Sequence, residues 1–306
     1  MRILLTGANG QLGQDLQAAL AGRVPDGGRR CSLRGPEGDH RDPGHDVLAT
    51  DVHNMHVEDR DAVQTTVLAF RPHLILHVGA LTAVERCEAE ADLAYAVNAI
   101  GTRHVAEAAD AVGAHLLYVS TDYVFDGTAE RAYREWDAPN PQSVYGASKR
   151  AGEMECPPGA TVVRTSWVSG AHGANMVKTA LRLAEREGDL FFVDDQRGSP
   201  TFTADLAPAL VTLGTERRSG VFHVTNAGAT TWCELVRQVL TEVGADPTRV
   251  HPIKTADLDP PLTAPRPANS VLDNLALRLS GLPPLPAWQD GLSRLVSALR
   301  SQGTLA

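Results

Sequence analysis

The stretch RILLTGANGQLGQDLQAALAG, residues 2–22, decides the fold. RILLT predicts a short buried strand, GANGQLG a turn, and QDLQAALAG a helix. In such a unit Gly7 permits the tight turn, Gly10 lets the backbone approach a pyrophosphate, and Gly13 allows close helix packing, with the phosphates at the helix N-terminus. Because the glycines lie between a strand and a helix, they predict a dinucleotide-binding turn.

Strands and helices continue to alternate after this unit. Residues 61–70 and 92–113 predict helices, and the segments HLILHVGA (73–80) and HLLYVSTD (115–122) predict strands. Repeated βα units with short apolar strands indicate a parallel sheet with right-handed crossovers. The predicted fold class is therefore α/β, a Rossmann-type doubly wound parallel sheet with a smaller mixed α/β C-terminal substrate-binding part.

The alternation loosens after about residue 170. Helices are predicted at 176–188 and 231–244, short strands at 189–195 and 220–226, and a proline-rich run follows at 252–267. We expect a dinucleotide-binding domain over 1–168. Residues 169–306 would be mainly a C-terminal substrate-binding part that returns some elements to the main sheet, with the ligand pocket between the lobes.

An insertion separates the first helix from the second strand. Residues 22–46 are rich in Gly, Pro, Arg and Asp and predict a surface segment. The following VLATD predicts a strand that ends at Asp51, where a dinucleotide fold carries an acid for the adenosine ribose. A carboxylate there disfavours a 2′-phosphate, so Asp51 leans toward NADH over NADPH. An Arg-rich insertion folded back on the site, or a simple turn role for Asp51, are the alternatives.

The segment SVYGASKR, residues 143–150, places Tyr145 four residues before Lys149. On a helix this spacing puts both side chains on one face. A nearby cation stabilises phenolate, so Lys149 is expected to lower the pKa of Tyr145 and to let it exchange protons with a substrate oxygen near pH 7. An exposed Tyr/Lys pair that only solvates a helix is the alternative reading.

Composition narrows the class of protein. The chain has 306 residues, 43% of them hydrophobic and 21% charged, a net charge of −9 and a pI of about 5.6. The basic residues are dispersed, which argues against a nucleic-acid surface. The four cysteines have no metal-ligand spacing, so no metal site is predicted. With no apolar run of membrane length and no leader pattern, we expect no membrane partner and a cytoplasmic protein.

Eight segments together resemble a known family. In chain order they are TGANGQLG, ALTAVERCE, YAVNAIGT, STDYVFDG, VYGASK, VRTSWV, DDQRGSPTFTADLA and RPANSVLD, spread from residue 6 to residue 273. They are similar to the dTDP-4-dehydrorhamnose reductase family of the extended short-chain dehydrogenase/reductase superfamily. The resemblance implies reduction of the 4-keto group of a dTDP-linked 6-deoxyhexulose by NADH or NADPH, in deoxysugar biosynthesis.

The resemblance also implies roles for individual residues. Tyr145 would protonate the C4 oxygen, Lys149 would hold the nicotinamide ribose, and Thr121 would hydrogen-bond the carbonyl. Besides Gly7 and Gly13, the cofactor contacts would be Gly10, Gln11, Leu12, Asp51, Ala80, Thr82, Tyr145 and Lys149. Substrate contacts would be Thr121, Asp122, Tyr123 and Trp167.

Thr121 and Trp167, and also Arg266 as a candidate substrate-binding residue, have alternative structural interpretations. A hydroxyl after a strand, such as that of Thr121, commonly caps a turn or helix. Trp167 follows an apolar strand, where core packing is the default and a floor for a sugar pocket is the alternative. Arg266 could bind a diphosphate bidentately, or it could be a surface arginine between prolines.

Some residues depart from the family pattern. His77 stands where the family usually has Asn, His56 where Asp is usual, and Glu85 where Asp is common. These changes bear on cofactor affinity and preference. Met176 replaces a frequent Phe, a change that a flexible side chain tolerates.

Other functions stay open at this stage. The substrate could be another nucleotide-linked keto or aldehyde sugar, as for a dTDP-dihydrostreptose synthase. A non-catalytic dinucleotide-binding regulatory subunit is a second alternative, against which the intact Tyr145, Lys149 and Thr121 set argues. An epimerase or dehydratase is a third, and the absence of an Asp-Glu pair after Thr121 disfavours dehydratase. The resemblance admits a homodimer assembled through Mg²⁺, with Asp15 and Asp189 as loose candidate ligands.

Overall fold

A six-stranded parallel sheet forms the centre of the molecule. The computed structural model describes residues 1–23 and 44–302, so most of the predicted insertion at 22–46 lies outside the described residues. The strand order is β10-β5-β4-β3-β1-β2, and each neighbouring pair is parallel. The strands are β1 (Arg2–Thr6), β2 (Asp46–Thr50), β3 (Leu74–His77), β4 (His115–Thr121), β5 (Thr161–Thr165) and β10 (Gly220–His223).

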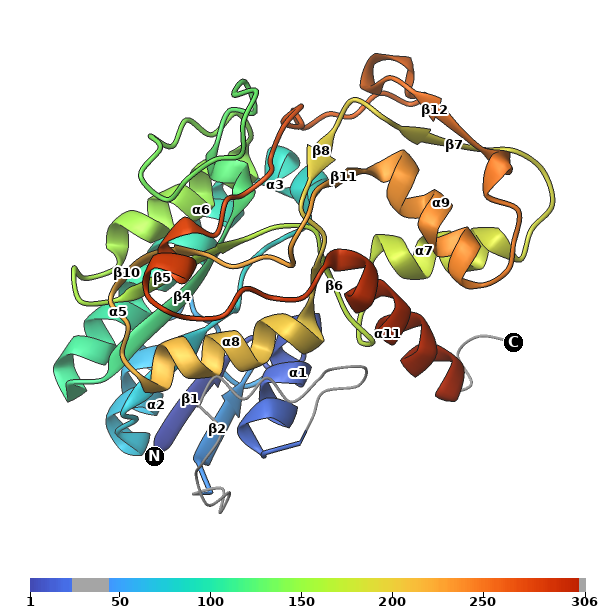
Figure 1. Ribbon diagram of the computed structural model, residues 1–306. Coiled ribbons are helices and arrows are strands. Elements are labelled where there is room, and N and C mark those ends of the chain that lie inside the picture. Colours follow the sequence, from blue (N-terminus) through green and yellow to red (C-terminus); the bar gives the residue numbers. More distant parts are fainter. Residues whose placement is uncertain (24–43, 303–306) are drawn as a thin grey trace.

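Successive side chains of a strand point to opposite faces, and both faces of this sheet are apolar. In β1, Ile3 and Leu5 join the core beneath α1 (Gln11–Leu20) and α8 (Thr203–Thr215). Leu4, between them, joins the core beneath α2 (Arg60–Phe70) and α5 (Gly101–Val112). Figure 1 shows α1 and α8 together along one side of the sheet. The doubly wound α/β prediction is confirmed.

The helices that carry the candidate site lie on the α5 side of the sheet. Short helices α3 (Val84–Ala89) and α4 (Ala91–Tyr95) lead through a π-helical turn, η1 (Ala96–Ile100), into α5. The single helix predicted over 92–113 is thus divided. Beyond β4 and the 3₁₀ turn η2 (Asp122–Val124), α6 (Val144–Glu155) begins at Ser143, whose hydroxyl accepts the Gly146 N–H at 3.1 Å. The predicted helix opening at SVYGASKR is confirmed.

Chain from beyond residue 169 returns to the sheet. Helix α8 packs against α1, and β10 pairs in parallel with β5 at the sheet edge. The short helix α10 (Leu275–Leu279) contacts β10. A single cut at residues 168/169 therefore does not separate all sheet elements from the rest, and the exact division into domains stays a prediction.

The remaining C-terminal elements form a second lobe with its own core. Helices α7 (Met176–Ala184), α9 (Trp232–Glu242) and α11 (Trp288–Ser301) surround apolar side chains that include Leu235, Val239 and Leu292. Figure 1 shows this lobe beside the sheet, with β7 and β12 at its outer edge. Its short strands are β6 (Val168–Ser169), β7 (Leu190–Val193), β8 (Arg197–Gly198), β9 (Thr201–Phe202), β11 (Thr230–Thr231) and β12 (Val250–Ile253), and its 3₁₀ turns are η3 (Pro247–Arg249) and η4 (Thr255–Asp257).

One predicted strand is interrupted. The segment TVVRTSWV forms β5 and then β6, with Ser166 and Trp167 between them. Trp167 has φ of 47°, a left-handed conformation that is uncommon for a bulky residue. The chain turns there from the main sheet into the second lobe, and β6 pairs with β9 rather than with β4. This turn places the indole of Trp167 at the junction of the two lobes.

Candidate active site

A cavity of about 670 Å³ crosses the carboxyl ends of the sheet strands. Ligands of open α/β sheets bind at this edge. The cavity is lined from both lobes by residues that the sequence singles out, and by others that it does not. The predicted residues in its wall are Gly7, Gly10, Gln11, Leu12, Gly13, Asp51, Ala80, Thr82, Thr121, Asp122, Tyr123, Tyr145, Lys149 and Trp167.

The glycine turn shapes one end of the cavity through close backbone contacts. Gly7 has φ of 69°, and a Cβ on Gly7 would lie 2.7 Å from the backbone of Gly79. A Cβ on Gly13 would lie 2.2 Å from the Gly7 carbonyl oxygen, so α1 packs against the turn at a distance that only glycine allows. Gly10, Gln11 and Leu12 at the N-terminus of α1 line the cavity, and the unpaired N–H groups of a helix N-terminus suit an anion such as a pyrophosphate.

The Gln11 side chain forms hydrogen bonds within the protein. Its Oε1 accepts hydrogen bonds from the Gly170 N–H at 3.2 Å and the Asn175 amide at 2.9 Å, and its Nε2 donates to the Ala174 carbonyl at 3.1 Å. The amide thus ties the glycine turn to the loop that precedes α7. A cofactor contact from this residue would use its backbone.

Asp51 directly follows β2 and lies in the cavity wall. Its carboxylate accepts hydrogen bonds from the backbone N–H groups of Asn9 at 3.0 Å and Val52 at 2.8 Å. These bonds link the acid to the glycine turn and fix its direction. The nearby wall also contains the carboxylate residue Glu58, beside His56 at 3.1 Å. Asp51 and Glu58 thus place two carboxyl groups at this end of the cavity.

Thr121, Asp122 and Tyr145 meet beyond the end of β4. The Thr121 hydroxyl donates to the Asp122 carboxylate at 2.9 Å and accepts the Tyr123 N–H at 3.3 Å. Burial raises the pKa of Asp122 to about 6. Burial likewise raises the pKa of the Tyr145 phenol, and a hydrogen bond with Thr121 opposes that rise. A phenol in this state holds its proton at neutral pH, as a proton donor must.

Lys149 does not act on Tyr145 as the helical spacing predicts. Its ammonium donates to the Val119 carbonyl at 2.7 Å and lies 4.1 Å from the centre of the Tyr118 ring. Burial, which disfavours the charged form, lowers the pKa of Lys149 to about 7. The expectation that Lys149 lowers the pKa of Tyr145 is wrong for this structure, because the effect of burial on the phenol is larger.

A buried ion pair holds the helix of Tyr145 and Lys149 against the sheet. Glu153, one turn beyond Lys149, accepts two hydrogen bonds from the Arg164 guanidinium, at 2.8 and 2.7 Å. Ser120 donates to the same carboxylate at 2.6 Å, and Arg150 at 2.8 Å. The pKa of Glu153 is lowered, because these partners outweigh its burial. This network joins α6 to β4 and β5.

Two tryptophans form the wall at the second lobe. The Trp167 and Trp232 rings are stacked with centroids 3.6 Å apart, and both line the cavity. The Trp232 Nε1–H donates to Gln196 at 3.2 Å. Gly198 lies against the other indole, where a Cβ would approach Trp167 to 2.3 Å. Trp167 therefore packs within the protein and also lines the cavity, and its contact with a sugar stays a prediction.

Arg266 is placed differently from the other predicted residues. It is absent from the cavity wall, and its guanidinium pairs with Glu85 at 2.6 Å and lies 5.9 Å from the Tyr123 ring centre. Glu85 also accepts the N–H groups of Thr263 and Ala264. The glutamate that departs from the family pattern thus fastens the proline-rich segment to α3. A diphosphate contact by Arg266 stays a prediction.

Some residues of the cavity wall and one residue behind it are not predicted as site residues from the sequence. Trp232, Thr165 and Ser166 line the cavity, whereas the sequence predicts only a helix at Trp232 and a strand at Thr165 and Ser166. Asn98 lies behind the wall, where its amide bonds both backbone groups of Leu81. Thr165 could have been found from strand alignment, because it is the register partner of Thr121. Sequence spacing carried no signal for the other three.

His77 is a buried structural residue. Its ring bonds the hydroxyls of Thr6 at 2.7 Å and Thr102 at 3.2 Å, linking β1 and α5. Burial, assisted by the charge of Lys149, lowers its pKa to about 3, so the ring is neutral. His77, at a position where the resemblance expects Asn, therefore supplies a polar link between these elements without adding a charge.

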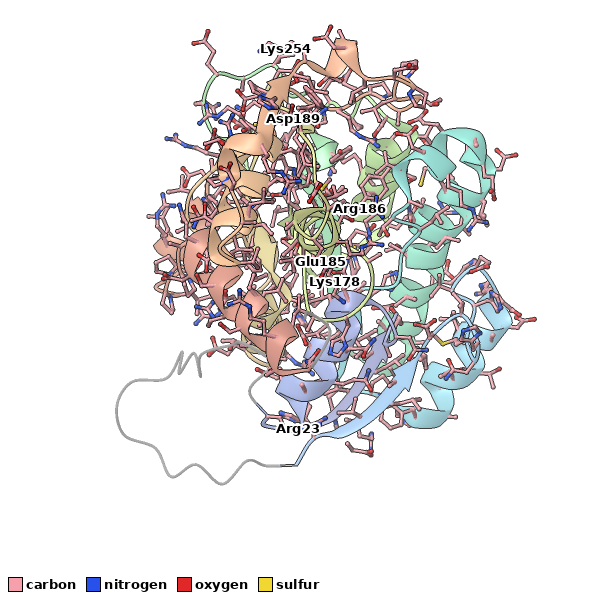
Figure 2. All side chains as sticks on the ribbon, turned by 90° about the vertical axis from the view of Figure 1, so that its right-hand side faces the viewer. Arg23, Lys178, Glu185, Arg186, Asp189 and Lys254 are labelled. Carbon is pink, nitrogen blue, oxygen red and sulfur yellow. The ribbon has the colours of Figure 1, made fainter. Side chains whose placement is uncertain are left out.

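The two candidate ligands for Mg²⁺, Asp15 and Asp189, lie in different surroundings. Asp15 is buried in α1, 3.8 Å from His172, whereas Asp189 is exposed and pairs with His251 at 3.2 Å. Figure 2 shows Asp189 on the outer face of the second lobe, with Arg186 and Lys178 on the same face. In the described part of the chain, three potential ligands gather at Asp194, Cys233 and Glu234, and neither candidate is among them. Within the same residues, every helix is too short or too polar to cross a membrane.

The chain is similar in sequence to reductases of dTDP-linked keto sugars. Residues 37–301 match the family model described as the RmlD substrate binding domain. A dTDP-4-dehydrorhamnose reductase of Streptomyces griseus is 40% identical, covering 97% of this chain and 94% of that protein. A dTDP-4-keto-6-deoxy-D-glucose reductase of Streptomyces niveus is 36% identical, covering 98% of each.

A solved structure is similar over the whole length. The crystal structure of dTDP-4-dehydrorhamnose reductase from Bacillus anthracis, in complex with NADP, superposes with a TM-score of 0.85. Its sequence is 37% identical, and the match covers 97% of this chain and 98% of that one.

We predict that Lys149→Met stabilises the protein, more at pH 7 than at pH 9. The folded pKa of about 7 lies below the unfolded value, near 10.4. Between these values the unfolded chain binds more protons, so the wild type gains stability as pH rises and the variant lacks that gain. The stabilisation should shrink by about 2 kcal/mol between pH 7 and 9.

Urea unfolding of both proteins at the two pH values measures this difference. Lys254→Met, which removes an exposed lysine of the second lobe, is the control and should show no such change. An equal effect of Lys149→Met at pH 7 and pH 9 would contradict a depressed pKa.

Proposed function

The chain belongs to the family of the RmlD substrate binding domain, and on that premise we propose that it reduces the 4-keto group of a dTDP-linked 6-deoxyhexulose with a nicotinamide dinucleotide. The observation that carries this proposal is one cavity that joins the glycine turn to Thr121, Tyr145 and Lys149. A non-catalytic dinucleotide-binding subunit would not need a half-buried phenol and a buried threonine at the far end of that cavity.

The residues fit a dinucleotide. The close approach of Gly13 to Gly7 opens the N-terminus of α1 to phosphate, and Asp51 is directed by backbone bonds at the neighbouring strand end. Lys149, held at the Val119 carbonyl, would reach the nicotinamide ribose. When bound, the reduced cofactor supplies the hydride.

Side chains of the protein would protonate and hydrogen-bond the C4 carbonyl oxygen of the sugar, which becomes negatively charged during hydride transfer. Tyr145 keeps its proton at neutral pH and would deliver it to the C4 oxygen. Thr121, whose hydroxyl donates to Asp122 in this structure, would turn that hydroxyl to the same oxygen, and donors at this position stabilise a developing alkoxide. Tyr123 and Trp167 would contact the sugar, and Arg266 the diphosphate once its pairing with Glu85 loosens.

For cofactor choice we propose NADH. The Asp51 carboxylate repels a 2′-phosphate, and Glu58 adds negative charge to the same wall. The Bacillus anthracis relative was crystallised with NADP, so preference within the family has to be measured for each chain. A homodimer assembled through Mg²⁺ and a cytoplasmic location stay predictions of the resemblance.

The function is tested by absorbance at 340 nm with NADH or NADPH and dTDP-4-keto-6-deoxyglucose, with and without a 3,5-epimerase. We expect oxidation that requires the epimerase, because that enzyme forms the 6-deoxy-L-hexulose. Oxidation without the epimerase would assign a D-configured 4-keto sugar instead. Absence of oxidation in both mixtures, with cofactor binding confirmed by fluorescence, would contradict reduction of this sugar class.

Tyr145→Phe should keep cofactor binding and lose turnover. The substitution removes only the hydroxyl, and a positioned proton donor contributes about 10²- to 10⁴-fold. Steady-state kcat and the fluorescence-measured Kd for NADH provide the two readouts. Tyr95→Phe, on an exposed tyrosine of α4, is the matched control. Turnover within a factor of two of the wild type would exclude Tyr145 as the acid.

Asp51→Ala should shift the cofactor preference toward NADPH. Loss of a charged hydrogen-bond partner of the ribose should reduce the NADH/NADPH ratio of kcat/KM by about tenfold or more. Asp46→Ala, at the opposite end of the same strand β2, should leave the ratio unchanged. A ratio that Asp51→Ala does not alter would show that another residue binds the ribose.

A further inference from the structure

Thr165 is the last residue of β5 and lies in the cavity wall with 4% of its surface exposed. Its hydroxyl has no hydrogen-bond partner among the residues that the structure describes. A buried hydroxyl without a partner destabilises a fold, and buried side-chain hydroxyls normally find one. The position therefore calls for an explanation that packing alone does not give.

The neighbouring hydroxyls at this strand edge are all engaged. Ser120 donates to Glu153 at 2.6 Å, Thr121 to Asp122 at 2.9 Å, and Ser166 to the Ser199 carbonyl at 2.6 Å. Each of these hydroxyls has a partner within the protein, which Thr121 would have to leave in order to bind the carbonyl. The Thr165 proton is available to a ligand.

The place of Thr165 in the sheet indicates which part of a ligand it meets. It is the register partner of Thr121, and neighbouring strands lie about 4.8 Å apart, so its hydroxyl is one strand away from the proposed carbonyl site. In the order β10-β5-β4-β3-β1-β2, β5 lies beyond β4 on the side away from Asp51 and the glycine turn. The cavity wall continues from there into Trp167. This is the end opposite the adenosine.

We propose that the Thr165 hydroxyl binds the sugar of the nucleotide-linked substrate, through an oxygen beside the reacting carbonyl. The inference rests on the proposed function. The hydroxyl supplies a single neutral hydrogen bond that positions the ring relative to Thr121 and Tyr145. The nicotinamide carboxamide offers the same hydrogen-bonding chemistry, and the measurements below separate the two ligands.

The test compares Thr165→Val, which removes the hydroxyl at constant shape, with Thr165→Ser, which retains it. For Val we expect the KM of the sugar to rise about 3- to 10-fold, the range of one neutral hydrogen bond. The Kd values for NADH and for dTDP alone should not change, and Ser should restore the KM. The midpoint of thermal unfolding of the ligand-free Val variant should be equal to or above that of the wild type, since an unsatisfied hydroxyl has been removed.

Thr161→Val is the matched control on the same strand. The Thr161 hydroxyl donates to the Arg218 carbonyl at 2.6 Å, away from the cavity, so its loss should lower the unfolding midpoint without altering the KM of the sugar. The two valine variants are thus expected to have opposite effects on stability and binding.

Three results would overturn the inference. An unchanged sugar KM together with an unchanged Kd for NADH in Thr165→Val, with the wild type active, would show that the hydroxyl binds neither ligand. A raised Kd for NADH with an unchanged sugar KM would assign it to the nicotinamide. A wild type that oxidises neither cofactor with the sugar would remove the proposed function itself, and with it this role of Thr165.

Discussion

The buried pair of Glu153 and Arg164 is the interaction on which the geometry of the candidate site depends. A carboxylate with 2% of its side chain exposed is costly unless its oxygens are fully satisfied, and here a bidentate guanidinium, a hydroxyl and a second arginine satisfy them. The pair joins α6 to β5, and the Ser120 hydroxyl joins the same carboxylate to β4. Tyr145 and Lys149 lie on that helix, so the ion pair holds the helix that carries them against the strand that ends at Thr121.

Strand periodicity separates this support from the site itself. Ser120 and Arg164 are register partners on one face of β4 and β5, and both bind Glu153. Thr121 and Thr165, the next residues, point to the other face and line the cavity. Ser120 also lines the cavity, so only Arg164 of the first pair serves the support of α6 alone.

Local patterns predicted much of the fold and part of the site. The glycine spacing of residues 7–13 gave the turn, and apolar runs gave the main strands, because these signals reside within a few residues. The sequence predicts that C-terminal elements return to the sheet, but the pairing of β10 with β5 and the stack of Trp167 on Trp232 depend on contacts between distant segments. No spacing in the sequence encodes such contacts, so they became visible only in the folded chain.

The prediction that Lys149 lowers the pKa of Tyr145 is wrong because it, too, considers only residues that are close in the sequence. Helical spacing considers Tyr145 and Lys149 alone and predicts that the ammonium stabilises phenolate. The fold buries Lys149 and partly buries Tyr145, which raises the pKa of the phenol and lowers that of the amine, so each is shifted toward its neutral form. A phenol with its usual pKa of about 10 is already protonated at neutral pH, so burial keeps Tyr145 in the form that donates a proton but makes it a weaker acid. A bound dinucleotide, by carrying negative charge toward Lys149, would favour the ammonium, and the charge of the ammonium would favour proton release from Tyr145.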